Sequence, residues 1–242
     1  MIQNPPPGER WLIVNADDIG QTPGINRGVA RAYREGIVTS GSLMVRFDAA
    51  EAAATWARTE GFDLGLHVDL GEWSYRDGDW EPVYTVVDDT DDGEAVAEEL
   101  RRQLHRFREL VGDDPTHLDS HQHQHRSPPL RELLDALGRK LGVPVRSHSP
   151  IRYDGSFYGQ DGRGYPYAEA ITPQALVHTI ETLPAGITEL GCHPGEGVDG
   201  PSMYAAERPF EVQSLCDPRV RAALAAHQVR LVSFAGVRVK AP

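Results

Sequence analysis

Short apolar runs alternate along this chain with segments of helical periodicity, and that alternation limits the fold more than any other feature. Seven runs have the length and β-branched content of strands, at residues 11–16, 41–47, 64–70, 116–122, 143–148, 187–193 and 229–234. Most intervening segments repeat apolar residues at helical spacing, at 23–35, 48–59, 93–111, 128–141, 172–183 and 217–227. Because strands that alternate with helices form βαβ units, the sequence predicts an α/β fold with about seven parallel strands, either closed into a barrel or doubly wound.

The chain shows no strong internal linker, so we expect a single domain over residues 1–242, with a flexible N-terminus at 1–10. Two longer segments, 71–92 and 149–171, interrupt the regular alternation. Solvated loops are the simplest expectation for both. Long loops at the strand ends of an α/β fold also build substrate clefts, so both segments are equally candidates for the walls of a binding site.

The chain is acidic, because 24 Lys and Arg stand against 36 Asp and Glu and give a formal net charge of −12. Such a surface repels phosphate backbones, so nucleic acid is not an expected partner. No stretch approaches the roughly 18 consecutive apolar residues of a membrane helix, and the first residues lack the pattern of a signal peptide. The two cysteines are too few for a disulfide framework. We therefore expect a cytoplasmic protein with no membrane partner.

Polar residues gather where four of the predicted strands end, at 15–18, 67–69, 119–121 and 192–195. In α/β folds the carboxyl ends of the strands form the edge where ligands bind and catalysis occurs. Each cluster has an ordinary explanation by itself: a helix N-cap for the paired aspartates, a core position for one histidine, a turn for another. Taken together, aspartate and histidine from separate strands make a mixed nitrogen and oxygen metal site. The sequence therefore predicts a metal site at this edge.

The stretch HLDSHQHQH, residues 117–125, places four of the ten histidines in nine positions. Alternate side chains share one face of a strand, but they rise by about 3.3 Å per residue and cannot all reach one ion. His121 stands at the predicted strand end and is the best-placed ligand. His123 and His125 would follow in the loop, suited to supporting or substrate-contacting roles or to a fourth coordination position. His117 would lie deeper in the strand, in a structural role.

Five motifs along the chain contain most of these residues: NADDIG (15–20), GIVTSGSLM (36–44), GLHVDL (65–70), THLDSHQHQH (116–125) and CHPG (192–195). In this combination and order the chain resembles the YdjC-type carbohydrate deacetylases, a family that includes chitooligosaccharide deacetylases and hopanoid-associated relatives. The stretch YAAERPFEVQSL (204–215) resembles the family segment that follows its HPG motif. The resemblance implies a distorted TIM-like (β/α) barrel, one divalent metal ion and hydrolysis of an N-acetyl group on a sugar.

The resemblance also implies roles for individual residues of this chain. The metal ligands fall on Asp18, His67 and His121, the general base on Asp17 and the general acid on His193. Positions beyond the direct ligands, which would support the site or touch substrate, are expected for Asp119, His123, His125 and Arg146. The donor set of two histidines and one aspartate suits Zn²⁺, and the resemblance also allows Mg²⁺ or another divalent ion.

The expected partner is a small N-acetylated carbohydrate, and a homodimer is compatible with the sequence. Aromatic residues of the two long segments suit either stacking on sugar rings or hydrophobic cover over the barrel mouth: Trp73, Tyr75, Trp80, Tyr153, Phe157, Tyr158 and Tyr165. Two departures from the family pattern, Ile19 and Arg46, bear on substrate identity more than on the metal set.

Three other functions remain open at the level of sequence. A metal-dependent phosphoesterase on a barrel would use similar histidines, but it would need more ligands, around two metals. A glycosidase with paired carboxylates would explain Asp17 and Asp69 and leave four histidines without a task. A sugar-binding or regulatory relative would keep the fold but would have lost catalytic turnover.

Overall fold

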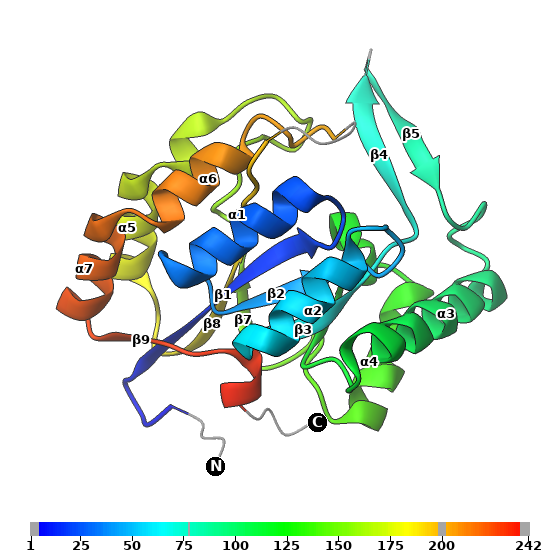
Figure 1. Cartoon of the computed structure of the whole chain (residues 1–242), viewed down its shortest axis with the longest axis horizontal. Helices are drawn as coiled ribbons and strands as arrows, with labels where there is room; N and C mark the ends of the chain where they lie inside the picture. Colours follow the sequence, from blue (N-terminus) through cyan, green and yellow to red (C-terminus); the bar gives the residue numbers. More distant parts are fainter. Residues whose placement is uncertain (1–4, 77, 198–201, 238–242) are drawn as a thin grey trace.

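The computed structural model describes residues 5–76, 78–197 and 202–237. Its centre is a parallel sheet of seven strands in the order β6-β3-β2-β1-β8-β7, with β9 pairing with the first residues of β1. The strands are β1 (Arg10–Ile19), β2 (Ser40–Leu43), β3 (Asp63–Val68), β6 (Leu118–Ser120), β7 (Arg152–Asp154), β8 (Gly186–Cys192) and β9 (Val229–Leu231). The sheet is curled into a partial barrel, so the predicted α/β fold of one domain with mostly parallel, barrel-like strands is confirmed (Figure 1).

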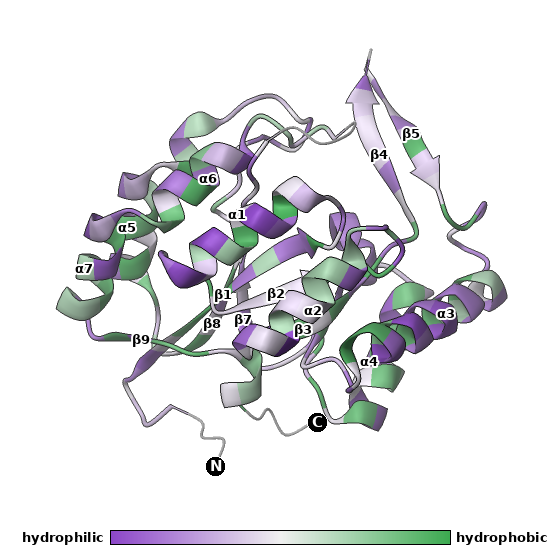
Figure 2. Cartoon of the chain, viewed as in Figure 1, coloured by the Kyte–Doolittle hydropathy of each residue, from purple (hydrophilic) through white to green (hydrophobic). Residues whose placement is uncertain are grey.

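Helices surround the curled sheet and pack their apolar faces against it (Figures 1 and 2). They are α1 (Pro23–Arg34), α2 (Ala50–Glu60), α3 (Gly93–Val111), α4 (Leu130–Leu141), α5 (Pro173–Thr182), α6 (Arg208–Leu215) and α7 (Pro218–Ala226). Three short 3₁₀ segments complete the described part of the chain: η1 (His121–Arg126), η2 (Ala168–Ile171) and η3 (Phe234–Gly236). No helix in these described ranges combines the length and apolarity that a membrane span needs.

Capping residues explain why the helices begin and end close to the predicted bounds. The Thr22 side chain accepts a hydrogen bond from the Ile25 backbone N–H, and Pro23 occupies the first turn of α1. At α3 the Asp92 carboxylate accepts from two backbone N–H groups, and Gly112 ends the helix at φ 83°. A left-handed C-cap favours glycine because a Cβ is strained there. The predicted helix at 93–111 therefore matches α3 at both ends.

The predicted strand at 143–148 is wrong, because the structure has only an isolated bridge between Val145 and Leu118 there. Pro144 has no N–H to donate, and the chain leaves the sheet direction at Ser147, which has φ 65°. The predicted strand at 116–122 is also too long, since β6 ends at Ser120 and the chain then turns into η1. That turn rests on left-handed backbone at Gln122 and His123, which strand periodicity does not reveal.

The two long segments are not simple loops. Residues 71–92 contain β4 (Gly71–Arg76) and β5 (Asp79–Thr85), an antiparallel hairpin that projects from the edge of the sheet (Figure 1). Residues 149–171 contain β7, which pairs with β8, and also η2. The expectation of solvated loops is therefore wrong for a large part of both segments.

Helix α1 approaches the loop after β8 closely at Gly28. A Cβ built on Gly28 of α1 would lie 2.3 Å from the Gly195 Cα, and that neighbour is backbone, which does not yield easily. We expect Gly28→Ala to lower the free energy of unfolding by about 1–3 kcal/mol, the usual range for overpacking. Urea denaturation would measure this loss. Gly162→Ala is the matched control, because a Cβ there meets open space; equal stability of the two variants would contradict the expectation.

Candidate active site

A cleft of about 460 Å³ opens where the parallel strands end. The strand ends contribute Asp17 and Asp18 from β1 and His67 from β3, and His193 follows β8. The walls come from the 3₁₀ turn η1, from the β4–β5 hairpin and from segments 153–164 and 202–208. The two long segments of the sequence thus contribute directly to the lining of this cleft. Their side chains that line it are Glu72, Trp73, Trp80, Tyr153, Phe157, Tyr158, Gln160 and Asp161.

One carboxylate and two imidazoles converge in this cleft. The Asp18 Oδ1 atom lies 3.0 Å from His121 Nδ1 and 3.4 Å from His67 Nε2, and all three side chains are buried. One atom from each residue lies within 4.8 Å of the others, a spacing that could hold a metal ion. Ligand atoms about 2.1 Å from a shared divalent ion are about 3.0–3.4 Å apart, so the Asp18 contacts fit such an ion. The chemistry of this donor set suits Zn²⁺ and other divalent ions.

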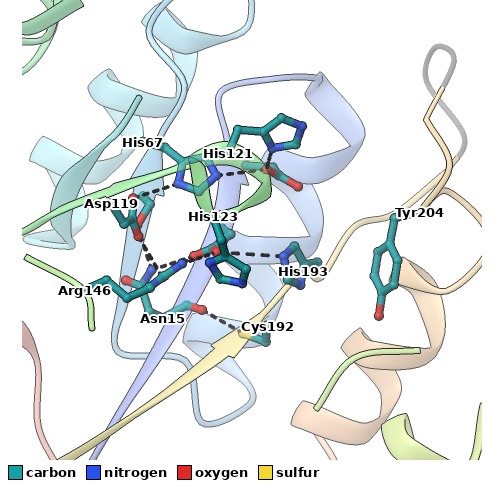
Figure 3. Close-up of polar contacts among 12 residues, drawn as sticks. Asn15, His67, Asp119, His121, His123, Arg146, Cys192, His193 and Tyr204 are labelled. Carbon is teal, nitrogen blue, oxygen red and sulfur yellow. Dashed lines mark hydrogen bonds and ion pairs between the residues drawn. The ribbon is translucent and has the colours of Figure 1, made fainter. Parts of the chain in front are cut away.

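The outer nitrogen of His67 is held by a carboxylate. His67 Nδ1 lies 2.7 Å from Asp119 Oδ1 (Figure 3). This contact leaves Nε2 directed at Asp18. Burial lowers the pKa of His67, but Asp119 outweighs it and raises the pKa to about 10. Burial also lowers the pKa of His121, but the Asp18 carboxylate outweighs this effect and raises the pKa to about 9. In the metal-free protein these imidazoles therefore carry protons, which a cation would displace on binding.

Arg146 lies behind the cleft and neutralises a second group of carboxylates. Its guanidinium makes paired contacts of 2.6 and 2.7 Å with Asp17, and it also lies 2.7 Å from Asp119 and 2.6 Å from Glu189. Burial alone would raise the pKa of Asp17, but Arg146 reverses this and holds that pKa below its usual range. Asp17, His67 and Asp119 are also close enough for a metal. Arg146 contacts both carboxylates of this second group, whereas Arg208 contacts only the Oδ2 atom of Asp18, so the Asp18 group is the better cation site.

His193 faces the same oxygen of Asp17 that Arg146 contacts. Its Nε2 atom lies 3.8 Å from Asp17 Oδ2, and its backbone N–H donates to Glu211 Oε2 at 2.5 Å. The rings of Tyr158 and Tyr204 meet the imidazole edge-on. Burial lowers the pKa of His193 to about 4, so its imidazole is neutral in the resting protein at neutral pH.

The histidines of the stretch 117–125 lie in different environments. His117 Nε2 lies 3.0 Å from Ser42 Oγ and its ring stacks on Phe234, in a packed position away from the cleft. His125 is fully buried, with Nδ1 2.9 Å from Ser120 Oγ. His123 lines the cleft, 3.4 Å from the Tyr153 hydroxyl. The expected common face of alternate histidines is wrong beyond residue 120, because the strand ends there.

Several residues of the site were missed from the sequence. Arg208 of α6 lies 2.6 Å from Asp18 Oδ2, and Glu211 of the same helix accepts from the Tyr204 hydroxyl as well as from the His193 backbone. Burial raises the pKa of Glu211 to about 8. Glu72 of the hairpin lies 3.7 Å from His121 Nε2. The resemblance over 204–215 was a signal for the α6 residues, whereas the hairpin carried no comparable pattern.

The structure places two further sets of residues that the sequence analysis related to substrate: the aromatic residues of the long segments, and Arg46. Of the seven aromatic residues named above, five line the cleft among the described residues, and Tyr75 and Tyr165 do not. Arg46 lies 2.8 Å from Asp69 and 3.6 Å from Glu99, outside the cleft lining within the same described residues. Its ion pairs are therefore with carboxylates other than those of the strand-end residues described above.

Similar proteins share both the sequence and the fold. The family model described as YdjC-like protein matches residues 11–226. A chitooligosaccharide deacetylase of Serratia marcescens is 32% identical over 263 residues, covering 93% of this chain and 98% of the relative. A carbohydrate deacetylase of Geobacillus stearothermophilus is 29% identical over 249 residues, covering 93% and 97%.

Solved structures show the same architecture at lower identity. A protein of Enterococcus faecalis V583, described as a candidate for cellobiose-phosphate cleavage, superposes with a TM-score of 0.78 at 23% identity, covering 96% of this chain and all of that one. A family 4 carbohydrate esterase of Streptomyces lividans, solved with acetate, gives 0.54 at 15% identity, covering 96% and 98%. The chain belongs to the YdjC-like family, and the similar curated proteins are named chitooligosaccharide and carbohydrate deacetylases.

Proposed function

We propose that this protein is a metal-dependent hydrolase that removes an N-acetyl group from an amino sugar or short oligosaccharide. The observation that carries the proposal is the convergence of Asp18, His67 and His121 beside Asp17, with His193 in the same cleft 3.8 Å from Asp17. The names of the similar deacetylases support the same reaction class. Zn²⁺ or Mg²⁺ is the expected ion, one per chain.

Asp18, His67 and His121 would hold the ion through Oδ1, Nε2 and Nδ1, the atoms that face one another. A divalent ion in such a site supplies Lewis acidity, which polarises a carbonyl oxygen and lowers the pKa of water. The second Asp18 oxygen is held by Arg208 at 2.6 Å, so only one oxygen is free to face the cation. Asp119 keeps the His67 ring oriented by accepting from its outer nitrogen.

Asp17 is the proposed general base for the attacking water. Arg146 and Asn15 fix its carboxylate, and the lowered pKa keeps it ionised at neutral pH. Its Oδ2 atom faces both Arg146 and His193. A base held in this way cannot rotate away from the cleft, which places it for proton transfer in each turnover.

His193 is the proposed donor of the proton that the departing amine requires. Because its imidazole is neutral at rest, the proton has to reach it during the reaction. Asp17 is the nearest source, 3.8 Å from His193 Nε2. Water then supplies a hydroxyl to the acetyl carbon and a proton to the nitrogen, and the C–N bond breaks to release acetate and the free amine.

The aromatic walls of the cleft are proposed to bind the sugar. Trp73 and Trp80 come from the hairpin, Tyr153 and Tyr158 from the second long segment, and Tyr204 from the segment before α6. Aromatic faces pack well on the apolar faces of sugar rings, while tyrosine hydroxyls and indole N–H groups bond the sugar hydroxyls. A volume of about 460 Å³ lies within the range of small-molecule sites.

The test is acetate release from N-acetylated mono- and disaccharides, measured before and after treatment with a chelator. We expect release by the metal-loaded protein, loss of release after chelation and recovery on adding Zn²⁺ or Mg²⁺. Release that continues unchanged without metal would overturn the metal-dependent proposal. Phosphate release from sugar phosphates, with no acetate from any acetylated sugar, would instead favour a phosphoesterase.

A further inference from the structure

The two histidines that face Asp18 present their outer nitrogens to different carboxylates. His67 turns Nε2 toward Asp18 and Nδ1 toward Asp119, at 2.7 Å. His121 turns Nδ1 toward Asp18, and its Nε2 atom is buried without a hydrogen-bond partner among the described residues. The nearest carboxylate to that nitrogen is Glu72 Oε2, at 3.7 Å. Glu72 therefore stands toward His121 as Asp119 stands toward His67, at a longer distance.

Glu72 reaches this position because the hairpin delivers it. It lies on β4, only 4% of its surface is exposed, and its side chain lines the cleft next to that of Trp73. Neighbours on a regular strand point to opposite faces, but the β4–β5 register shifts between Glu72 and Trp73. This irregularity is what allows two successive side chains to face the same cleft.

The hairpin is tied to the segment that carries His121 by one side chain. Gln122 accepts from the Trp73 backbone N–H at 2.9 Å and donates to the Trp73 carbonyl at 2.7 Å. Its amide therefore pairs with β4 as a neighbouring strand would. Since Gln122 follows His121 directly and Trp73 follows Glu72 directly, the pair of bonds sets the distance between His121 and Glu72.

We propose that Glu72 is a positioning residue for the metal ligand His121, and that Gln122 seats the hairpin that carries it. The proposal rests on the proposed metal site at Asp18, His67 and His121. A carboxylate that accepts from the outer N–H of a ligating histidine fixes its tautomer and ring orientation and makes it a better ligand. One wall of the substrate cleft would thus be part of the structure that holds the metal.

The first experiment measures metal affinity without using activity. Zn²⁺ is titrated calorimetrically into the metal-free wild type, Glu72→Gln and Glu81→Gln, the last being an exposed carboxylate on the same hairpin. We expect Glu72→Gln to bind Zn²⁺ about 10–100-fold more weakly, the usual effect of removing such a partner. Glu81→Gln should bind as the wild type does. An unchanged Kd in Glu72→Gln would overturn the proposal.

The second experiment tests the role of Gln122 through Gln122→Asn, alone and combined with Glu72→Gln. Asparagine tolerates the left-handed backbone at this position, but its shorter side chain does not reach Trp73. We expect weaker Zn²⁺ binding in the single variant and no additional loss in the double variant, because both changes act on one contact. If Gln122→Asn weakened Zn²⁺ binding by the same factor in the wild type and in Glu72→Gln, the role of Gln122 in seating the hairpin would be overturned. A wild type that binds no stoichiometric metal would instead overturn the proposed function.

Discussion

Asp17→Asn is expected to lower the kcat of acetate release by roughly 10²- to 10⁴-fold, the range associated with general acid–base catalysis. The substitution keeps the size of the side chain and removes its capacity to accept a proton. Arg146 loses one charged partner but keeps Asp119 and Glu189, so the buried guanidinium remains neutralised. A steady-state assay at saturating substrate measures the effect on kcat.

Two measurements accompany this assay. Metal stoichiometry should stay at about one ion per chain, because Asp17 is not in the proposed ligand set. Asp91→Asn removes an exposed carboxylate ahead of α3 and should leave turnover unchanged. Turnover of Asp17→Asn within a few-fold of the wild type would remove Asp17 from the role of general base.

His121→Ala is expected to remove the metal ion, because the variant keeps only two of the three proposed ligands. Metal content measured by atomic absorption after gel filtration should fall from about one ion per chain to nearly none. Acetate release should fall to the level of the chelated wild type. Thermal unfolding of the metal-free proteins separates loss of metal from loss of fold.

His123→Ala is the matched control for this experiment. His123 lies two residues away in the same 3₁₀ segment and lines the same cleft, but it is not in the group of Asp18, His67 and His121 that could hold a metal ion. The control variant should keep its metal, and any change in it should appear in the KM for the sugar. Full metal content in His121→Ala would remove His121 from the ligand set, and loss of metal in His123→Ala would add His123 to it.

Helix positions could be predicted well because their signals are local. Apolar spacing and capping residues lie within a few positions of each other, as the match at 93–111 shows. Strand lengths were predicted less well. Five of the predicted strands run past the observed ends of β2, β3, β6, β8 and β9. At 116–122 this happens because His121 continues the alternation after the backbone has turned. A side-chain pattern carries no information about a left-handed residue that ends a strand.

The residues of the candidate site were likewise predictable only in part. The residues at the carboxyl ends of β1 and β3 and directly after β8 were predictable, because parallel strands bring their carboxyl ends to one edge whatever the details of the connections. Arg146 was named as a supporting residue, but its contact with three carboxylates could not be foreseen, since the predicted strand there does not form. Glu72 could not be identified, because the hairpin reads as a polar loop.

The alternation of strands and helices follows from the sequence alone, and so does the edge at which Asp17, Asp18, His67, His121 and His193 gather. The charge that each of these residues faces depends on the tertiary structure. The partners that supply this charge, Glu72, Arg146, Arg208 and Glu211, come from a hairpin, a turn and a helix distant in the chain. An ion pair depends on distances of about 3–4 Å, which are set by long-range packing, whereas the strand edge depends only on chain direction.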